Sequence, residues 1–476
     1  MPASYEQVPY PGFPFEQTHP DRLATMATLF GVDAASVECC RVLELGCGGG
    51  RNLIPMAFGL PKSKFTGIDN DATAIGRGQE EIAALGLVNI RLEAIDLLDS
   101  SDALGSYDYI IAHGLYSWAP AAVREKLFAV LSASLASRGI AYVSFNAYPG
   151  SRVRQALREM LLFHIRNEND SAKRIEMARN FLTWFEGSQT GEGFGALLKA
   201  EARRLLNANP SFWYHDELEE TYYPIYFHEF IAQASRYGLQ FLCEAVYRDM
   251  QRPKEVDHMV RDRVLREQYL DFVTLRKFRQ TLLCGNGLKV LENADAMRVR
   301  GMFVASDARK GTSAGADAQE FRDSVGAVVK TANPIAKALL ECLGEAWPEA
   351  LSFPTLQASI AERSGREPDT GALARVLLDL FRVAFVELRM RRPGCVKKIS
   401  PTPAVSLLAR YQASHGCFIT TPRHTTLEPP SDFERRLIAL LDGTHDRMAL
   451  ERELPKSDGD VTASLERLGR MGMLIS

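Results

Sequence analysis

The sequence contains no long apolar run. No stretch approaches the roughly 18 consecutive apolar residues that a membrane-spanning helix needs. Residues 1–15 also lack the basic start and following apolar segment that mark a secretory signal. We therefore expect a protein without membrane insertion and with a cytoplasmic location.

The eight cysteines follow no pairing pattern. They are Cys39, Cys40, Cys47, Cys243, Cys284, Cys342, Cys395 and Cys417. No two of them form a Cys-x-x-Cys pair, so neither a zinc site nor a disulfide framework is indicated. We expect reduced, mostly buried thiols and no bound metal.

The charge balance shows little excess of either sign. A net charge of -3 argues against a chain that is basic throughout, and so against a general nucleic-acid binder. With 46% hydrophobic and 24% charged residues, the composition is that of a globular protein. A length of 476 residues, at roughly 150 residues per domain, predicts two to four domains.

The first third of the chain alternates between strand-like and helix-like segments. Predicted strands cover 41–45, 64–68, 90–94, 107–112 and 140–145, and predicted helices cover 52–58, 72–85 and 121–134. This alternation is typical of a parallel α/β sheet, in which ligands bind at the carboxyl ends of the strands.

The later segments change in character. Residues 152–167, 172–185 and 194–207 have helical spacing and are interpreted as an insertion. A helix at 228–238, a strand at 239–247, a helix near 256–272 and an apolar stretch at 278–284 are expected to complete the sheet. Residues 309–324 suit a linker, since they are rich in Gly, Ala, Ser and Asp.

Two segments near the C-terminus, 333–388 and 433–475, share a rhythm of helix, helix and short apolar strand, which predicts winged-helix-like units. The expected domains are a core with an N-terminal lid (1–150), a helical insertion (151–215), a regulatory-like region that completes the core sheet (216–308) and a C-terminal winged-helix-like region (325–476).

A glycine-rich turn follows the first strand, where residues 44–52 read ELGCGGGRN. Glycines suit a tight turn that a ligand approaches closely. A dinucleotide-binding Gly-x-G-x-x-Gly pattern counted from Gly46 would need glycine at position 51, where this chain has Arg51. Glu44 instead fits a site for a cationic amino group, such as the ammonium of S-adenosylmethionine, although an ordinary solvated strand end is the alternative.

Carboxylates also stand at the ends of the next two predicted strands. Asp69 lies about twenty residues after the glycine turn, where it can accept hydrogen bonds from two ribose hydroxyls. Asp96 can accept from an adenine amino group, with Ile68, Ile95 and Leu97 around the ring. Either aspartate alone could be a helix N-cap, and Cys47 is read as a small filler of the turn. The candidate cofactor-binding residues are Glu44, Gly46, Cys47, Gly48, Gly50, Asn52, Asp69, Asn70, Asp96, Leu97 and His113.

The strings VLELGCGGG, FTGIDND and EAIDLLD resemble the nucleotide-binding motifs of class I S-adenosylmethionine-dependent methyltransferases. Flanking strings such as YDYIIAHGLYSWAP, YVSFNAYPG and YYPIYFHEFIAQASRYGLQFL resemble a bacterial group with a methyltransferase regulatory domain, which includes protein-lysine methyltransferases. The resemblance implies a Rossmann-like α/β sheet, here with a helical insertion and winged-helix-like C-terminal units, and S-adenosyl-L-methionine as cofactor.

The ends of the fourth and fifth strands supply the candidate catalytic residues, which are His113, Tyr116, Trp118, Asn146 and Tyr148. An aromatic-walled channel would suit a long aliphatic amine. His113 is a candidate for cofactor binding or proton acceptance, and Tyr116 and Tyr148 for orienting the nitrogen by hydrogen bonds. The alternative is that Trp118 and Tyr148 only pack against the inserted helices.

Residues 17–22 are expected to fold over the cofactor as a lid, or Thr18 to be a simple N-cap. Three functions remain open. The first is methylation of lysine side chains on a protein and the second is methylation of a small molecule. The third is a DNA-binding regulator that senses S-adenosylmethionine and uses Arg389, Arg391, Arg392, Lys397 and Lys398. A homodimer is left open as well.

Overall fold

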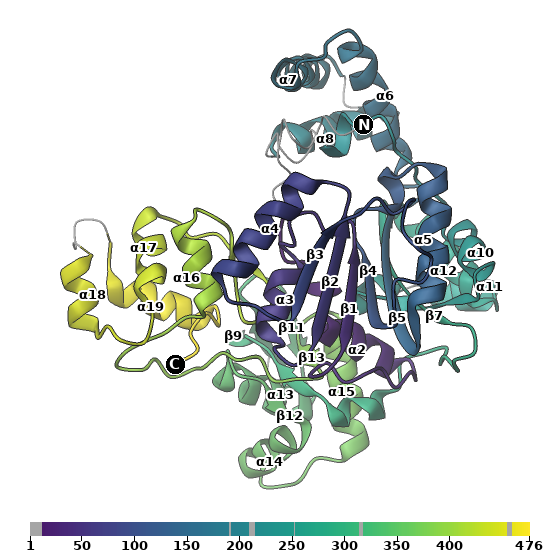
Figure 1. Cartoon of the computed structure of the whole chain (residues 1–476). Coiled ribbons are helices and arrows are strands. Elements are labelled where there is room, and N and C mark those ends of the chain that lie inside the picture. Colours follow the sequence, from purple (N-terminus) through teal and green to yellow (C-terminus); the bar gives the residue numbers. More distant parts are fainter. Residues whose placement is uncertain (1–11, 190–191, 209–214, 252, 314–317, 455–458) are drawn as a thin grey trace.

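A computed structural model of the chain describes residues 12–189, 192–208, 215–251, 253–313, 318–454 and 459–476. Its centre is a seven-stranded sheet, around which the other parts are arranged (Figure 1). No helix within the described residues is long and apolar enough to span a membrane.

The central sheet has the strand order β3-β2-β1-β4-β5-β7-β6. Its strands are β1 (Arg41–Leu45), β2 (Lys64–Asp69), β3 (Ile90–Ala94), β4 (Tyr107–Ala112), β5 (Leu135–Asn146), β6 (Leu239–Glu244) and β7 (Phe278–Gly285). The first five pair in parallel, and β7 pairs antiparallel with both β5 and β6. The predicted parallel sheet and its completion by the later strands are both confirmed.

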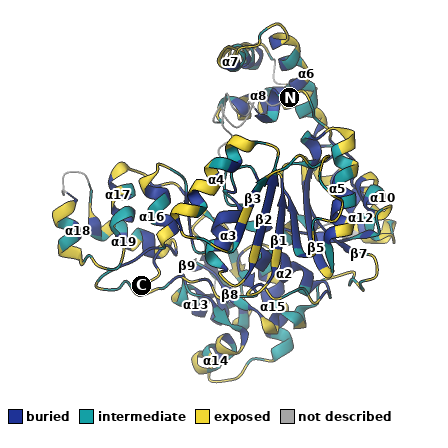
Figure 2. Ribbon diagram, in the orientation of Figure 1, coloured by how far each residue is buried: buried dark blue, intermediate teal, exposed yellow. Residues whose placement is uncertain are grey.

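Helices pack against this sheet and bury its side chains, which Figure 2 shows as a dark blue centre. They are α2 (Pro20–Leu29), α3 (Leu53–Gly59), α4 (Ala72–Ala84), α5 (Ala121–Ser134), α10 (Phe227–Ser235) and α12 (Arg263–Thr274). The short α11 (Lys254–Met259) lies against α12. The single helix predicted near 256–272 is thus two helices. The second begins because the Asp262 carboxylate caps it, accepting a hydrogen bond from Leu265 N at 2.8 Å.

The helical insertion consists of α6 (Arg152–Ile165), α7 (Ser171–Ser188) and α8 (Gly193–Leu206). The three helices pack on one another through their own apolar cluster, which includes Leu157, Leu161 and Leu182. They extend from the sheet at the end where α4 and α5 begin (Figure 1). The predicted helices at 152–167, 172–185 and 194–207 are confirmed with small changes at their ends.

The predicted linker at 309–324 is wrong. These residues contain β9 (Arg309–Ser313) and β10 (Gln319–Arg322), which form an antiparallel sheet with β11 (Val328–Thr331). The small-residue composition conceals a strand in which a charged residue is buried beside an apolar one. Phe321 and Glu320 are both buried, and Glu320 pairs with Lys330 on the neighbouring strand.

The next unit combines α13 (Pro334–Ala346), α14 (Phe353–Ser364) and α15 (Thr370–Arg382) with a sheet in the order β12-β8-β13. Its strands are β8 (Phe303–Ala305), β12 (Leu351–Ser352) and β13 (Glu387–Arg389). Leu339, Leu377 and Leu388 belong to the same apolar cluster as the central sheet. This unit is therefore packed continuously with the core.

The last unit has an apolar cluster of its own. It contains α16 (Leu407–Ser414), β14 (Ile419–Thr420), β15 (Thr426–Leu427), α17 (Asp432–Leu440), α18 (Arg447–Glu453) and α19 (Val461–Arg470). It begins earlier than the predicted 433, because α16 and the β14–β15 hairpin belong to it. The short apolar strand predicted within 433–475 is wrong, because residues 472–475, which end that segment, form no strand, although Met473 and Leu474 are buried in the cluster.

Candidate active site

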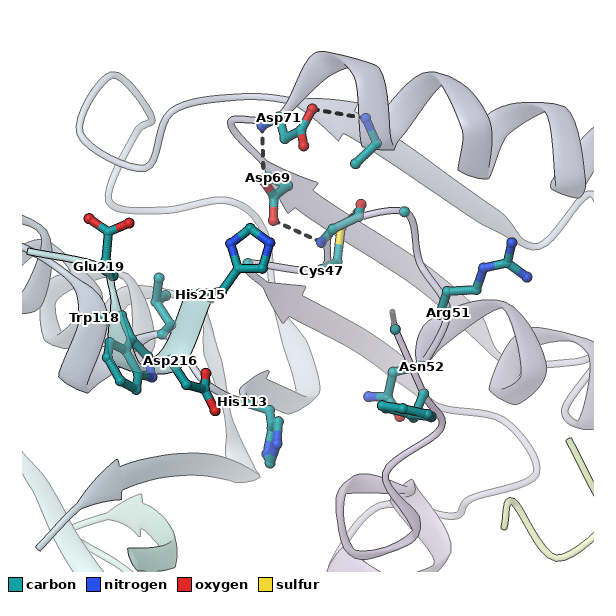
Figure 3. A pocket seen from close by; sticks show the side chains of 18 of the residues that line it. Cys47, Arg51, Asn52, Asp69, Asp71, His113, Trp118, His215, Asp216 and Glu219 are labelled. Atoms are coloured by element: carbon teal, nitrogen blue, oxygen red, sulfur yellow. Dashed lines mark hydrogen bonds between the residues drawn. The ribbon is translucent and has the colours of Figure 1, made fainter. Parts of the chain in front are cut away.

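A pocket of about 1600 Å³ opens at the carboxyl ends of the parallel strands. Its walls come from the central sheet, the helical insertion and the last C-terminal unit. Figure 3 shows the glycine turn with Cys47 and Asp69 on one side and Trp118, Asp216 and Glu219 on the other. The position agrees with the rule that α/β sheets bind ligands at the carboxyl ends of their strands.

Of the candidate cofactor-binding residues, all but one line this pocket: Glu44, Gly46, Cys47, Gly48, Asn52, Asp69, Asn70, Asp96, Leu97 and His113. Gly46 and Gly48 have φ angles of 73° and 51°, a region that favours glycine. Gly50 is absent from the described lining because it faces inward, where a Cβ would lie 2.8 Å from Leu92 Cδ1. Gly50 therefore allows the turn to pack closely against Leu92, on the side away from the pocket.

Glu44 is buried at the end of β1 with one oxygen satisfied and one not. Its Oε1 accepts a hydrogen bond from Asn52 Nδ2 at 2.7 Å. Among the described residues, none donates to Oε2. Burial raises the pKa of Glu44 to about 8, partly offset by the Asn52 hydrogen bond. A buried carboxylate oxygen without a donor suits a cationic ligand group, which would both satisfy the oxygen and favour the charged carboxylate.

Asp69, at the end of β2, is held by the backbone. Its Oδ2 accepts from Gly48 N at 2.8 Å and its Oδ1 from Asp71 N at 2.9 Å (Figure 3). Because each carboxylate oxygen has a second lone pair, both remain able to accept from the hydroxyls of a ribose. The helix N-cap of α4 is Asp71 and not Asp69.

Asp96 follows β3, and its Oδ1 accepts from Leu98 N at 2.9 Å. Ile68, Ile95 and Leu97 line the pocket beside it. A carboxylate beside three aliphatic side chains can hold a planar base with an amino group. Cys47 contributes bulk only, because burial raises the pKa of its thiol and keeps it protonated.

His113, after β4, is neutral and fixed on two sides. Its ring lies 3.9 Å from the ring of Phe15, centroid to centroid, and its Nδ1 is 2.9 Å from the Tyr142 hydroxyl. Tyr142 donates in turn to Gln280 Oε1 at 2.9 Å. Burial lowers the pKa of His113 to about 4. Because Tyr142 uses its only O–H to donate to Gln280, its oxygen accepts the hydrogen bond from Nδ1 of His113. Nδ1 then carries the proton of the neutral ring, and Nε2 is an acceptor.

The expected roles of two tyrosines are not supported. Tyr116 is fully buried, donates to Gln233 Oε1 at 2.7 Å and packs against Phe230. Tyr148 donates to Gln155 Oε1 at 2.8 Å. Neither belongs to the described lining of the pocket. Consecutive residues of the short 3-10 helix Tyr116–Trp118 face different sides, so Trp118 lines the pocket while Tyr116 points into the core.

The insertion contributes Arg154, Glu201 and Arg204 to the wall of the pocket. Arg154 on α6 pairs with the buried Glu217 at 2.8 Å and donates to Asn146 Oδ1 at 3.2 Å. Trp118 lines the pocket and packs on Tyr222, with ring centroids 5.1 Å apart. It also contacts the insertion, because the Arg154 guanidinium lies 5.3 Å from its ring centroid. The sequence reading missed the lining residues Phe15, Arg154, Asp216, Lys277 and Phe278. Their roles depend on contacts between segments that are distant along the chain.

The N-terminal segment contributes to the pocket through Phe13, Pro14 and Phe15 rather than through residues 17–22. Phe15 N donates to Asn52 Oδ1 at 2.8 Å. The N-cap predicted at Thr18 is wrong, because α2 starts after His19, whose Nδ1 accepts from Asp21 N. Thr18 instead donates to Phe15 O at 2.8 Å and accepts from Asn52 Nδ2 at 3.0 Å.

The last C-terminal unit covers the outer end of the pocket. Phe418 lies 4.8 Å from Phe13, centroid to centroid, and His424 Nε2 lies 3.0 Å from Asn52 Oδ1.

The three arginines of the basic cluster proposed for DNA are paired within the protein, whereas Lys397 and Lys398 are exposed. Arg389 is buried and pairs with Asp21 and Glu387. Arg391 pairs with Glu38, and Arg392 with Glu349. The pairs with Asp21 and Glu38 join this region to the core, so the predicted use of these arginines for DNA binding has no support in the geometry.

Three family models match parts of the chain. A methyltransferase domain matches residues 43–141, and a predicted methyltransferase regulatory domain matches residues 209–285. A "PKMT, C-terminal winged helix domain" matches residues 402–465, which confirms the winged-helix prediction for the last unit.

Relatives extend over nearly the whole chain. The uncharacterised protein RP789 of Rickettsia prowazekii is 32% identical over 94% of this chain and 84% of its own length. The structure of PKMT2 from Rickettsia typhi is 26% identical and superposes with a TM-score of 0.87, covering 98% of this chain and all of that one. The same protein in complex with AdoHcy superposes with a TM-score of 0.88, with the same identity and coverage.

Proposed function

Since the chain belongs to the S-adenosylmethionine-dependent methyltransferases that carry a methyltransferase regulatory domain and a PKMT-type winged helix domain, we propose that it N-methylates lysine side chains of a protein. Its cofactor, S-adenosyl-L-methionine, supplies an electrophilic methyl group when bound. The unsatisfied Glu44 Oε2 fits the cofactor's ammonium.

The remaining cofactor contacts follow from the pocket walls. Asp69 accepts from the ribose hydroxyls and Asp96 from the adenine amino group, with the ring among Ile68, Ile95 and Leu97. The glycine turn allows the backbone to approach the amino-acid end closely.

The size of the pocket is the main observation that favours a protein over a small molecule as the methyl acceptor. About 1600 Å³ exceeds the range of roughly 300–1,000 Å³ typical of small-molecule sites. The pocket also extends past the cofactor region to the exposed Glu220 and to Asp216 and Glu219. A protein segment that carries a lysine can enter from this side, where Glu219 and Glu220 complement its positive charge and Asp216 is paired with Arg154.

The chain must accept the lysine as a neutral amine, because an ammonium has no lone pair and a free lysine has a pKa near 10.4. The aromatic walls at Trp118 and Phe278 favour the uncharged form by removing water. Nε2 of His113 can accept a hydrogen bond or a proton from the amine, and Asn146 can orient it. In-line transfer then needs alignment rather than a covalent intermediate.

Transfer of label from S-adenosylmethionine to a fractionated lysate of the source bacterium tests this proposal. The matched control is the Gly46→Arg, Asp69→Ala double variant, whose cofactor site is blocked. We expect label in specific protein bands that disappears with the variant, and mass spectrometry then locates methyl-lysine. Label confined to the small-molecule fraction would favour a metabolite acceptor and reject the proposal.

We also infer a cytoplasmic location, because none of the eight cysteines is in a disulfide and Cys39 is an exposed free thiol.

The homodimer stays a prediction. Large apolar side chains are exposed on the insertion, namely Phe163, Trp184, Phe194 and Leu197, and sedimentation velocity measures whether the chain self-associates.

A further inference from the structure

The last C-terminal unit touches the amino-acid end of the cofactor site through one side chain. His424 lies in the turn between β14 and β15, and its Nε2 is 3.0 Å from Asn52 Oδ1. Asn52 in turn donates from Nδ2 to Glu44 Oε1 at 2.7 Å. His424 and Asn52 are 372 residues apart in the sequence. Through Asn52, His424 is linked to Glu44, the carboxylate that we assign to the cofactor's ammonium.

The turn that carries His424 is rigid. Thr421 N donates to Thr425 O at 2.9 Å and His424 N to Thr421 O at 2.9 Å, while Thr421 Oγ1 accepts from the backbone N of Arg423 and Thr425. These bonds hold His424 at a φ of 62°, which is uncommon for a residue other than glycine. Its ring is directed at Asn52.

The orientation of the Asn52 amide is fixed by its neighbours. Phe15 N can only donate, and it lies 2.8 Å from Oδ1, so Oδ1 and Nδ2 are not interchangeable. Because Oδ1 can only accept, His424 donates to it from Nε2. Burial and the nearby Arg389 lower the pKa of His424 to about 3, so the ring is neutral and Nε2 carries its single proton.

Glu44 depends on this arrangement. With Nδ2 of Asn52 directed at Oε1, the carboxylate is held so that Oε2 has no donor among the described residues. Loss of the His424 donor would leave Asn52 Oδ1 with its contacts to Phe15 N and Thr18 Oγ1 only. The amide would then hold Glu44 less firmly, because a buried network is most rigid when all of its members are fully bonded.

We propose that His424 is a positioning residue for cofactor binding, which holds Asn52 so that Glu44 presents its open oxygen to the ammonium of S-adenosylmethionine. The winged-helix unit is thereby part of the cofactor site. This inference rests on the cofactor and not on the identity of the methyl acceptor, so rejection of the lysine proposal would leave it standing.

The test compares two ligands on the full chain by isothermal titration calorimetry. S-adenosylhomocysteine has the ammonium, whereas 5′-methylthioadenosine has the same nucleoside without the amino-acid end. In His424→Phe, which keeps the ring but loses the donor, we expect the Kd for S-adenosylhomocysteine to rise about five- to ten-fold, the effect of one lost hydrogen bond. The Kd for 5′-methylthioadenosine should change less than about two-fold.

Two further variants complete the test. His424→Gln, which restores an N–H donor, should recover most of the affinity for S-adenosylhomocysteine. In an Asn52→Ala background, His424→Phe should have no additional effect, because the intermediary is gone. His445→Phe, on the same unit but outside the described pocket lining, is the matched control.

Thermal unfolding of each variant checks that it folds. Equal weakening of both ligands in His424→Phe would show a general distortion and overturn the proposal, as would unchanged affinity for S-adenosylhomocysteine. An undiminished effect of His424→Phe in the Asn52→Ala background would overturn it too.

Discussion

Arg154 Nη1 donates to Asn146 Oδ1 at 3.2 Å and so links the helical insertion to the end of β5. The same guanidinium pairs with the buried Glu217 at 2.8 Å. One side chain of α6 therefore sets the orientation of an amide in the pocket and anchors the segment that carries Asp216.

Replacement of Arg154 by Lys should lower the rate of methyl transfer. The lysine keeps a positive charge near Glu217 but lacks the planar fork with which Arg154 reaches Glu217 and Asn146 from different nitrogens. We expect about a ten-fold loss in initial rate in the lysate assay, equivalent to about 1.4 kcal/mol, with the KM for S-adenosylmethionine unchanged. Arg203→Lys, in an exposed pair with Glu186, is the control. An equal loss in both variants would contradict the role of Arg154.

Cofactor affinity should depend on the ionisation of Glu44. The pKa of Glu44 is raised to about 8, so below pH 8 the site must release a proton before the carboxylate can pair with an ammonium. The affinity for S-adenosylhomocysteine should therefore rise with pH by up to about ten-fold per unit below pH 8 and then level off. Calorimetry at pH 7 in buffers of different ionisation enthalpy should show proton release, absent in Glu44→Gln. Persistence of the pH dependence in that variant would refute the assignment.

Tyr116→Phe should leave methyl transfer within about two-fold of wild type, because the hydroxyl serves the core. Loss of its 2.7 Å hydrogen bond to Gln233 should cost about 1 kcal/mol of unfolding free energy. His113→Phe, in the pocket, should lower the rate by about 100-fold or more if it accepts the proton. A large loss of activity in Tyr116→Phe with normal stability would return Tyr116 to the catalytic set.

Arg279 is the central cation of a buried ion cluster, and its loss should destabilise the fold. It pairs with Asp271 at 2.9 Å and Glu267 at 3.2 Å and also contacts Glu244, all fully or nearly fully buried. Arg279→Met would leave buried carboxylates without their main partner, at a cost of about 3–5 kcal/mol. The urea midpoint measured by circular dichroism checks this. Arg236→Met, which breaks an exposed pair with Glu125, should cost less than about 1 kcal/mol.

The local features of the site could be predicted from the sequence. A strand, a glycine turn and an acidic residue at a strand end are encoded within about ten residues, as around Glu44 and Asp69. Parallel strands bring such ends together without further information, and the predicted Rossmann-like sheet is confirmed. The individual roles of these residues in binding and catalysis, like the domain boundaries, stay predictions.

What could not be predicted depends on long-range packing. Whether Tyr116 or Trp118 faces the pocket is set by Phe230 and the segment at Tyr222, both more than one hundred residues away. The contacts of Phe15 with His113 and of Arg154 with Asn146 have no local signal in the sequence. The composition of residues 309–324 gave no sign of their strands. Their charged residues, such as Glu320, pair with residues of a neighbouring strand and do not show the alternation of apolar and polar residues that marks a strand in the sequence.

The position of His424 near the C-terminus also determines when, during synthesis of the chain, the cofactor site can form. Asn52 leaves the ribosome 372 residues before its partner, which corresponds to roughly 20 to 75 s at a synthesis rate of about 5–20 residues per second. During that interval the nascent core has its glycine turn but lacks the contact that completes it. The full cofactor site is therefore a property of the finished chain, and the growing polypeptide is kept from acquiring it early.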